Sequence, residues 1–84
     1  MKEIKLYTTP ICGYCVMAKR LLEREGLTFK EINVIADPET RAWLVETSGQ
    51  RTVPQIYFGD DSIGGYRELL ALQKAGQLMA RLED

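Results

Sequence analysis

The 84-residue sequence predicts an α/β fold in which helices flank a four-stranded mixed sheet. Segments with the two-residue alternation of strands are interleaved with segments of helical periodicity, in the order β-α-β-α-β-β-α. A helix separates the first two predicted strands, so these strands should pair in parallel. The short Gly59-Asp60-Asp61 turn between the last two predicted strands favours an antiparallel pair at the other edge of the sheet.

The first half of the predicted fold is a strand, a helix and a second strand. Residues 4–8 alternate apolar and polar side chains and end at a turn. Helical periodicity follows and stops near Glu25, where Gly26 can close the helix. The second strand is predicted over residues 27–34, although its alternation of apolar and polar residues slips once at Lys30-Glu31.

The second predicted helix has clear signals at both ends. Asp37 can accept hydrogen bonds from the free amide groups of a helix start, and Pro38 suits the first helical position. The helix should run to about Ser48, where Gly49 can close it. These signals predict a helix between the second and third strands.

Two strands and two helical segments complete the predicted fold. One strand is predicted over residues 55–58, and a shorter one near Ser62-Ile63. The Gly64-Gly65 pair then breaks the chain before a helix that should stop near Gly76. A final short helical segment is predicted near residues 78–82.

Length and composition indicate one soluble globular domain spanning residues 1–84. Apolar residues make up 45% of the chain and charged residues 27%, without the bias of a disordered or fibrous protein. Eleven basic and twelve acidic residues, with no lysine or arginine run, argue against a nucleic-acid partner. No segment resembles a signal peptide or a membrane span, so we expect a cytoplasmic protein with no membrane partner.

The two cysteines, Cys12 and Cys15, form a C-x-x-C motif between the first predicted strand and the first predicted helix. The sulfur of Cys12 should lie at the helix N-terminus, where unpaired amide groups and the helix dipole favour negative charge. The pKa of this thiol should therefore lie below that of free cysteine, although the chain has no histidine to activate it. Cys15, one helical turn further, should be less exposed and able to form a disulfide with Cys12. We predict that Cys12 is the nucleophile and Cys15 the resolving cysteine.

Two other interpretations of the cysteine pair are a zinc half-site and a pair of structural thiols. Zinc normally takes four ligands, and this chain offers one cysteine pair and no histidine. Buried structural cysteines are common, but this spacing between a strand and a helix favours redox chemistry. A cytosolic location favours it too, because cytosolic reductants keep structural disulfides open.

Three separated motifs give the sequence a resemblance to the glutaredoxin family over almost its entire length. They are Cys12-Gly13-Tyr14-Cys15, Thr52-Val53-Pro54 and Gly64-Gly65. The resemblance implies a thioredoxin-like fold in which the third strand is antiparallel to the first. It also implies that Pro54 follows a cis peptide bond and faces the cysteines, and the cis form costs only about 0.5–1 kcal/mol before proline. Taken alone, Pro54 would be interpreted as an ordinary proline at the start of a strand.

The same resemblance implies a glutathione site. The backbone of Val53 would pair with the cysteine part of glutathione, and the start of the helix after Gly65 would hold the γ-glutamyl carboxylate. Arg41 and Arg51 would meet the glycyl carboxylate, although a solvated surface charge is the alternative for each. Tyr14 either covers the cleft beside the sulfurs or packs against the surface. The full set of implied binding residues is Tyr14, Arg41, Arg51, Thr52, Val53, Pro54, Gly65, Tyr66 and Arg67.

Three positions depart from the usual pattern of the family. Thr9 stands where the family usually has a lysine, and Arg67 stands where it often has an aspartate or threonine. Gly13 replaces the proline of the commonest motif. Family members without that proline sometimes hold a [2Fe–2S] cluster between two subunits, each supplying its first cysteine with bound glutathione. The alternative is that Gly13 only eases the turn.

The predicted function is glutathione-dependent reduction of protein disulfides and of glutathione mixed disulfides. Glutathione is the expected reductant, disulfide-containing or glutathionylated proteins are the expected partners, and the chain should be a monomer unless a cluster bridges two copies. Two alternatives stay open. The first alternative is a glutathione-ligated [2Fe–2S] carrier, which Gly13 supports because it replaces the usual proline. The second is a glutaredoxin-like electron donor that thioredoxin reductase reduces, which Thr9 supports because it replaces the usual lysine.

Overall fold

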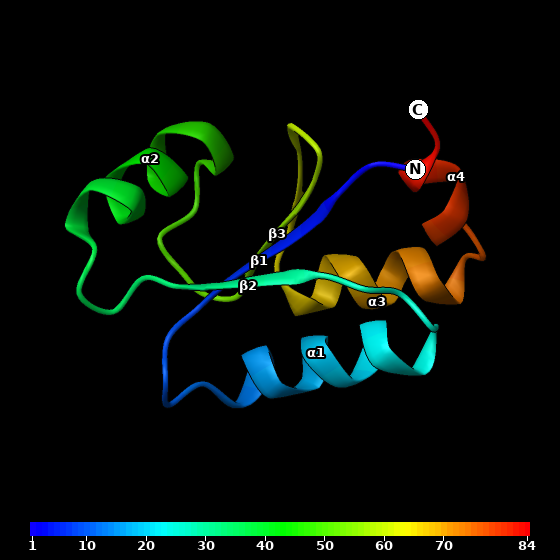
Figure 1. Cartoon of the computed structure of the whole chain (residues 1–84), viewed down its shortest axis with the longest axis horizontal. Helices are drawn as coiled ribbons and strands as arrows, with labels where there is room; N and C mark the ends of the chain where they lie inside the picture. The colour runs from blue at the N-terminus through cyan, green and yellow to red at the C-terminus, as the bar shows by residue number, and fades with distance from the viewer.

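The computed structural model describes residues 1–84 as four strands and four helices (Figure 1). The strands are β1 (Ile4–Thr8), β2 (Lys30–Asn33), β3 (Gln55–Phe58) and β4 (Asp61–Gly64). The helices are α1 (Gly13–Arg24), α2 (Pro38–Ser48), α3 (Tyr66–Lys74) and α4 (Leu78–Leu82). This is the predicted order of elements, including the short final helix. No helix combines the length and the apolar character that crossing a membrane requires.

The sheet has the strand order β2-β1-β3-β4. β1 runs parallel to β2 and antiparallel to β3, and β4 pairs antiparallel with β3 at the edge. The parallel and antiparallel pairs predicted from the connections are therefore confirmed. The antiparallel third strand that the family resemblance implied is confirmed as well. β1 and β3 form the centre of the sheet, so the loops at their ends lie side by side.

Helices cover both faces of the sheet. α1 and α3 lie together against one face, and α2 lies on the other side (Figure 1). Alternate residues of a strand point to opposite faces. Leu6 and Ile56 therefore join the core beneath α1 and α3, whereas Tyr7 and Tyr57 pack with Leu44 of α2. Both central strands therefore bury side chains on both faces, and the polar residues at the ends next to the two loops, Thr8 and Gln55, are buried as well.

The second strand is shorter than predicted, and its irregular alternation has a physical reason. Only Lys30–Asn33 pair with β1, so the predicted range of 27–34 was wrong at both ends. Phe29 packs on the α1 side of the sheet and Ile32 on the α2 side. Glu31, between them, accepts hydrogen bonds from Thr8 of β1 and from Lys19 of α1. The slip in the alternation therefore marks the point where the apolar side chains change from one core to the other.

Helix α2 has the ends that its sequence predicts. The side chain of Asp37 accepts a hydrogen bond from the backbone N–H of Thr40 at 3.1 Å. Hydrogen bonds from the side chain and the backbone of Thr40 hold the pKa of Asp37 below its ordinary value. Pro38 is the first helical residue, and Gly49 closes the helix in the left-handed conformation, with a φ of 74°. The start of α2 is thus capped by a carboxylate.

Candidate active site

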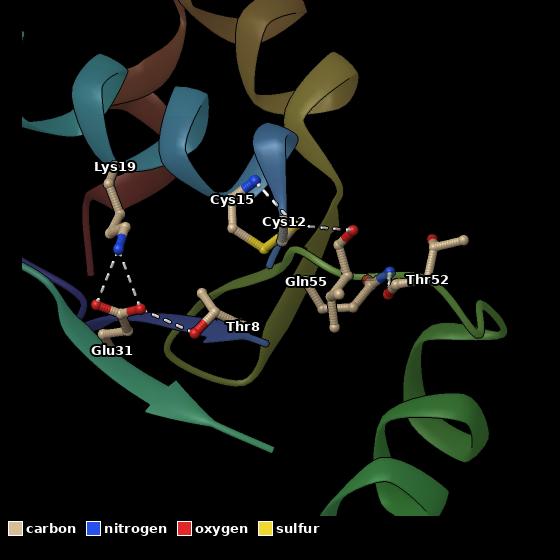
Figure 2. The surroundings of a disulfide bond; sticks show 8 residues. Thr8, Cys12, Cys15, Lys19, Glu31, Thr52 and Gln55 are labelled. Atoms are coloured by element: carbon tan, nitrogen blue, oxygen red, sulfur yellow. Dashed lines mark hydrogen bonds and ion pairs between the residues drawn. A yellow bond between two sulfur atoms is a disulfide. The ribbon is translucent and has the colours of Figure 1, made fainter. Parts of the chain in front are cut away.

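Cys12 lies in the loop after β1 and is the N-terminal cap of α1. Its backbone is extended, with φ −150° and ψ 101°, and its sulfur accepts a hydrogen bond from the backbone N–H of Cys15 at 3.1 Å. Figure 2 shows the disulfide bond between the two residues, whose Cα atoms are 5.2 Å apart. The first sulfur of the motif therefore lies at the helix N-terminus, as the sequence predicts.

The two cysteines differ in exposure. Cys15 is 2% exposed and belongs to the buried core, whereas Cys12 is partly exposed. The first turn of α1 contains no acidic residue, so no carboxylate competes with the Cys12 sulfur for the positive end of the helix. Of the two cysteines, only Cys12 is partly exposed to solvent.

The register of the sheet brings a second loop against Cys12. β1 and β3 are antiparallel and pair Tyr7 with Gln55, so the residues before β3 lie beside the loop after β1. The Val53–Pro54 peptide bond is cis, as the resemblance implied. The carbonyl oxygen of Val53 lies 3.7 Å from the Cys12 sulfur. A disulfide sulfur carries no hydrogen, so in this oxidised form the two atoms are in van der Waals contact rather than hydrogen-bonded.

Two hollows lie beside Val53, the residue whose carbonyl touches the Cys12 sulfur. The first, of about 240 Å³, lies between α2 and the loop before β3. The second, of about 350 Å³, lies between the same loop and the start of α3. Thr52 and Val53 line both hollows. Arg41 and Arg51 line the first, and the second is lined by Tyr14, Pro54, Gly65, Tyr66 and Arg67. The structure therefore brings all of the implied binding residues together around Val53.

Tyr14 both borders the second hollow and packs on a neighbouring side chain. Its ring stacks on that of Tyr66, with the centroids 6.0 Å apart and the planes at 22°. The side chain is still 51% exposed. The two interpretations of Tyr14 are thus compatible, because the stacked pair forms one wall of the hollow beside the C-x-x-C motif.

Gln55 is a residue of this region that the sequence analysis missed. It is fully buried at the start of β3, and its Nε2 donates hydrogen bonds to the carbonyl of Thr52 at 2.8 Å and to Oε1 of Gln50 at 3.1 Å. These bonds fix the loop that presents Val53. The available signal was a glutamine at the head of a strand whose other residues are all apolar. Gln50, which was also missed, lines the second hollow.

Glu68 was missed too, although it also lines the second hollow. Its Oε1 accepts a hydrogen bond from the backbone N–H of Gly65 at 2.8 Å, which satisfies one free amide at the start of α3. The same carboxylate fills the space beside Gly64, where a Cβ would lie 2.5 Å from Oε1 and where φ is 111°. The signal was the spacing of three residues between Gly65 and a glutamate, which is typical of a helix start.

A chain of polar contacts lies near the disulfide (Figure 2). The buried hydroxyl of Thr8 donates to Oε2 of Glu31 at 2.9 Å, and the ammonium of Lys19 lies 3.2 Å from the same oxygen. The three residues belong to β1, β2 and α1, so the contacts tie the end of the central strand to the helix that carries the cysteines. Lys19 is therefore engaged with a carboxylate.

The arrangement defines a class of protein. A central strand leads into a C-x-x-C motif at a helix N-terminus, and a cis-proline loop faces the exposed sulfur on a four-stranded sheet. This is the architecture of a thiol–disulfide oxidoreductase with the thioredoxin-like fold.

Comparisons with known proteins identify the family within this class. The Glutaredoxin family model matches residues 4–63. A glutaredoxin of Pseudomonas aeruginosa is 46% identical over 82 residues, which cover 98% of each chain. The solution structure of a glutaredoxin from Brucella melitensis, 45% identical, superposes with a TM-score of 0.86 over 98% of this chain and 89% of its own. A buckwheat glutaredoxin–glutathione complex, 27% identical, gives a TM-score of 0.89 over 96% and 76%. The chain belongs to the glutaredoxin family.

Proposed function

We propose that the protein uses glutathione to reduce glutathione mixed disulfides and protein disulfides, with Cys12 as the nucleophile and Cys15 as the resolving cysteine. The observation that carries this proposal is the partly exposed Cys12 sulfur at the N-terminus of α1, in contact with the Val53 carbonyl between two hollows. An attacking thiolate needs access to its substrate and stabilisation of its charge. Cys12 has both, whereas Cys15 is buried.

In the reduced protein, the contacts of Cys12 favour its ionised form. The backbone N–H of Cys15 points at the sulfur, and a hydrogen bond to an anion is stronger than one to a neutral acceptor. The helix dipole adds to this effect, because the first turn of α1 has no carboxylate to offset it. We therefore expect the pKa of the Cys12 thiol to lie below that of free cysteine without help from a lysine or histidine.

A glutathionylated protein would react through Cys12 alone. The Cys12 thiolate attacks the glutathione sulfur, so that an S–S bond forms between Cys12 and glutathione and the substrate protein leaves as a thiolate that takes up a proton. The thiolate of a second glutathione then attacks the same glutathione sulfur. This step releases glutathione disulfide and restores the Cys12 thiolate. The step balances because the substrate sulfur passes from disulfide to thiol while the sulfur of the second glutathione passes from thiol to disulfide, and the first glutathione sulfur remains in a disulfide throughout.

A protein disulfide would require both cysteines. The Cys12 thiolate attacks one sulfur of the substrate, and the other substrate sulfur leaves as a thiolate. Cys15, as a thiolate, then attacks the Cys12 sulfur, which releases the reduced substrate and forms the Cys12–Cys15 disulfide seen in the structure. Two glutathione molecules return this disulfide to the dithiol. The cycle needs a reduced glutathione pool, which the cytoplasm provides.

The two hollows offer complementary groups for bound glutathione. The guanidinium groups of Arg41 and Arg51 suit a carboxylate in the first hollow, and the amides at the start of α3 suit a second carboxylate in the other. Val53 lines both hollows and touches the Cys12 sulfur, so its backbone suits the cysteine residue of glutathione. The relative from buckwheat, which was solved as a complex with glutathione, supports this assignment.

Glutathione dependence can be tested by coupled turnover. The purified protein is mixed with the disulfide of glutathione and 2-mercaptoethanol, and NADPH oxidation is followed with glutathione plus glutathione reductase. A parallel assay replaces glutathione and its reductase with thioredoxin reductase. We expect turnover in the first assay that depends on the glutathione concentration. Turnover only in the second would overturn the proposal and favour the electron-donor alternative.

The residues of one chain do not fit an iron–sulfur cluster. No group of three or more histidine, cysteine, aspartate and glutamate side chains is placed to hold a metal ion. Of the two cysteines, only Cys12 reaches the surface. A cluster would therefore need ligands from outside the chain, and none of the steps above involves one.

A further inference from the structure

The residues that line the two hollows are more basic than the chain as a whole. The chain carries 11 basic and 12 acidic residues, yet the linings contain three arginines against a single acidic residue, Glu68. Glu68 is engaged with the backbone of Gly65. The arginines are Arg41, Arg51 and Arg67, and none of them takes part in the four ion pairs of the structure. Three positive charges without an ion-pair partner therefore line the hollows that share Val53, the residue in contact with the Cys12 sulfur.

Arg67 is the least expected of these charges. It is the second residue of α3, where the helix dipole disfavours a cation, and it is exposed. No acidic side chain pairs with it to offset this cost. A residue that opposes its local structure without compensation, at the edge of an active site, points to a role in binding.

The surface beside Cys12 has the composition of a polypeptide-binding site. Ile11 is fully exposed next to Cys12, and Val16 and Met17 are exposed in the first turns of α1. Apolar side chains bordered by charged ones are typical of protein interfaces. The partner of this surface is therefore expected to be a polypeptide.

We propose that Arg67, together with Arg41 and Arg51, selects disulfide-bonded polypeptides in which acidic residues flank the cysteine that Cys12 attacks. The inference rests on the proposed function in one respect, which is that Cys12 is the nucleophile. Val53 touches the Cys12 sulfur and lines both hollows, so side chains next to a cysteine bonded to Cys12 would lie near these arginines. Acidic flanks are attracted there, and basic flanks are repelled.

The test uses fully reduced protein and three cyclic peptides, each closed by one disulfide and blocked at both ends. The peptides differ only in the residues beside their cysteines, which are glutamate, glutamine or lysine. In a single turnover, Cys12 and Cys15 become a disulfide and the peptide becomes a dithiol, so that two electrons pass to the peptide and no glutathione is needed. Acid quenching and chromatography give the second-order rate constant for each peptide.

We expect the glutamate peptide to react about tenfold faster than the lysine peptide at low ionic strength. The difference should shrink to about twofold in roughly 0.5 M salt, because salt screens exposed charges. Arg67→Glu should lower the ratio of the two rate constants about fivefold at low ionic strength. The ratio is the readout because a change in the reactivity of Cys12 affects both peptides equally and cancels.

Lys74→Glu is the matched control. It makes the same change of charge at the last residue of α3, away from both hollows, and should leave the ratio unchanged. Equal rate constants for the three peptides, or equal effects of the two variants, would overturn the inference and leave the proposed glutathione chemistry intact. A wild-type protein that reduces no peptide would overturn the assignment of Cys12 as well. The salt dependence is measured on the wild-type protein, so this part of the test does not depend on whether a variant folds.

Discussion

Helices α1 and α2 begin in the same way with different chemistry. In each helix, the capping side chain accepts a hydrogen bond from the backbone N–H three residues further, at 3.1 Å. The cap of α2 is the carboxylate of Asp37, and Glu39 adds a second negative charge to the first turn. The cap of α1 is the sulfur of Cys12, and its first turn has no acidic residue.

The difference shows how one structural device serves two purposes. A carboxylate at the start of α2 is ionised at neutral pH and remains so, which stabilises the helix. At the start of α1 the same amides and dipole act on the sulfur of Cys12, and under the proposed function they would favour the thiolate that reacts. The predicted variants change one of the two caps or a residue in the first turn of α1.

Replacing the cap of α1 should have the largest effect. Cys12→Ser keeps a good helix cap but removes the nucleophile, so glutathione-coupled turnover should fall by at least about 1,000-fold. The thermal midpoint should stay near that of the reduced wild type, because serine accepts the same backbone hydrogen bond. A folded Cys12→Ser protein that retains turnover would show that the cap is not the nucleophile.

The second cysteine offers a narrower test. Cys15→Ser should keep most of the turnover with glutathione mixed disulfides, because Cys12 and its bond from the residue-15 amide remain. Reduction of a cyclic peptide disulfide should instead stop at a covalent adduct between Cys12 and the peptide. Mass spectrometry under acid quench would detect this adduct. Release of reduced peptide at the wild-type rate would contradict the resolving role of Cys15.

The order of the elements and the two helix caps could be predicted because their signals are local. Asp37, Pro38 and Gly49 lie next to the helix end that each one defines. The position of Cys12 at the start of α1 followed from the change of periodicity beside the motif. The bounds of β2 are not set by a local signal, because the length of this strand depends on how far it pairs with β1.

The candidate site could be predicted only in part. The family resemblance implied the cis bond before Pro54 and a set of binding residues, and the structure brings that set together. Gln55 and Glu68 were missed because their importance lies in contacts with the backbone of Thr52 and Gly65. Those contacts exist only once a loop has folded back or a helix has started, so residue type alone does not reveal them.

A new charge at the start of α1 should make its cap resemble that of α2. Gly13 is the first residue of α1, and a Cβ there would meet no atom within 4 Å. Gly13→Glu should raise the pKa of the Cys12 thiol relative to Gly13→Gln, because the new carboxylate repels the thiolate and offsets the field of the helix N-terminus. A dipole interaction of about 0.3–1 kcal/mol corresponds to a roughly two- to fivefold smaller thiolate fraction below the pKa. Alkylation rates against pH, in the Cys15→Ser background, measure this shift, and identical profiles would show that charge in the first turn of α1 does not affect the ionisation of Cys12.

Removing the charge from the cap of α2 should have the smallest effect. Asp37→Asn keeps an oxygen that can accept the bond from Thr40, but loses the carboxylate whose pKa those bonds lower. A group whose pKa is lower in the folded state contributes stability above its unfolded pKa, and that stability is lost as pH falls through the folded pKa. Wild type should therefore melt slightly above Asp37→Asn at neutral pH, and the two midpoints should converge on acidification.

The alkylation profile of Cys12 should not change in Asp37→Asn, in contrast to the Gly13 variants. The two caps act on different helices, and the carboxylate of Asp37 bonds to Thr40 of its own helix. A gap between the melting midpoints that stays constant from acidic to neutral pH would mean that the charge of Asp37 contributes nothing. The cap of α2 would then act through its hydrogen bond alone, whereas the proposed function requires the cap of α1 to carry a charge.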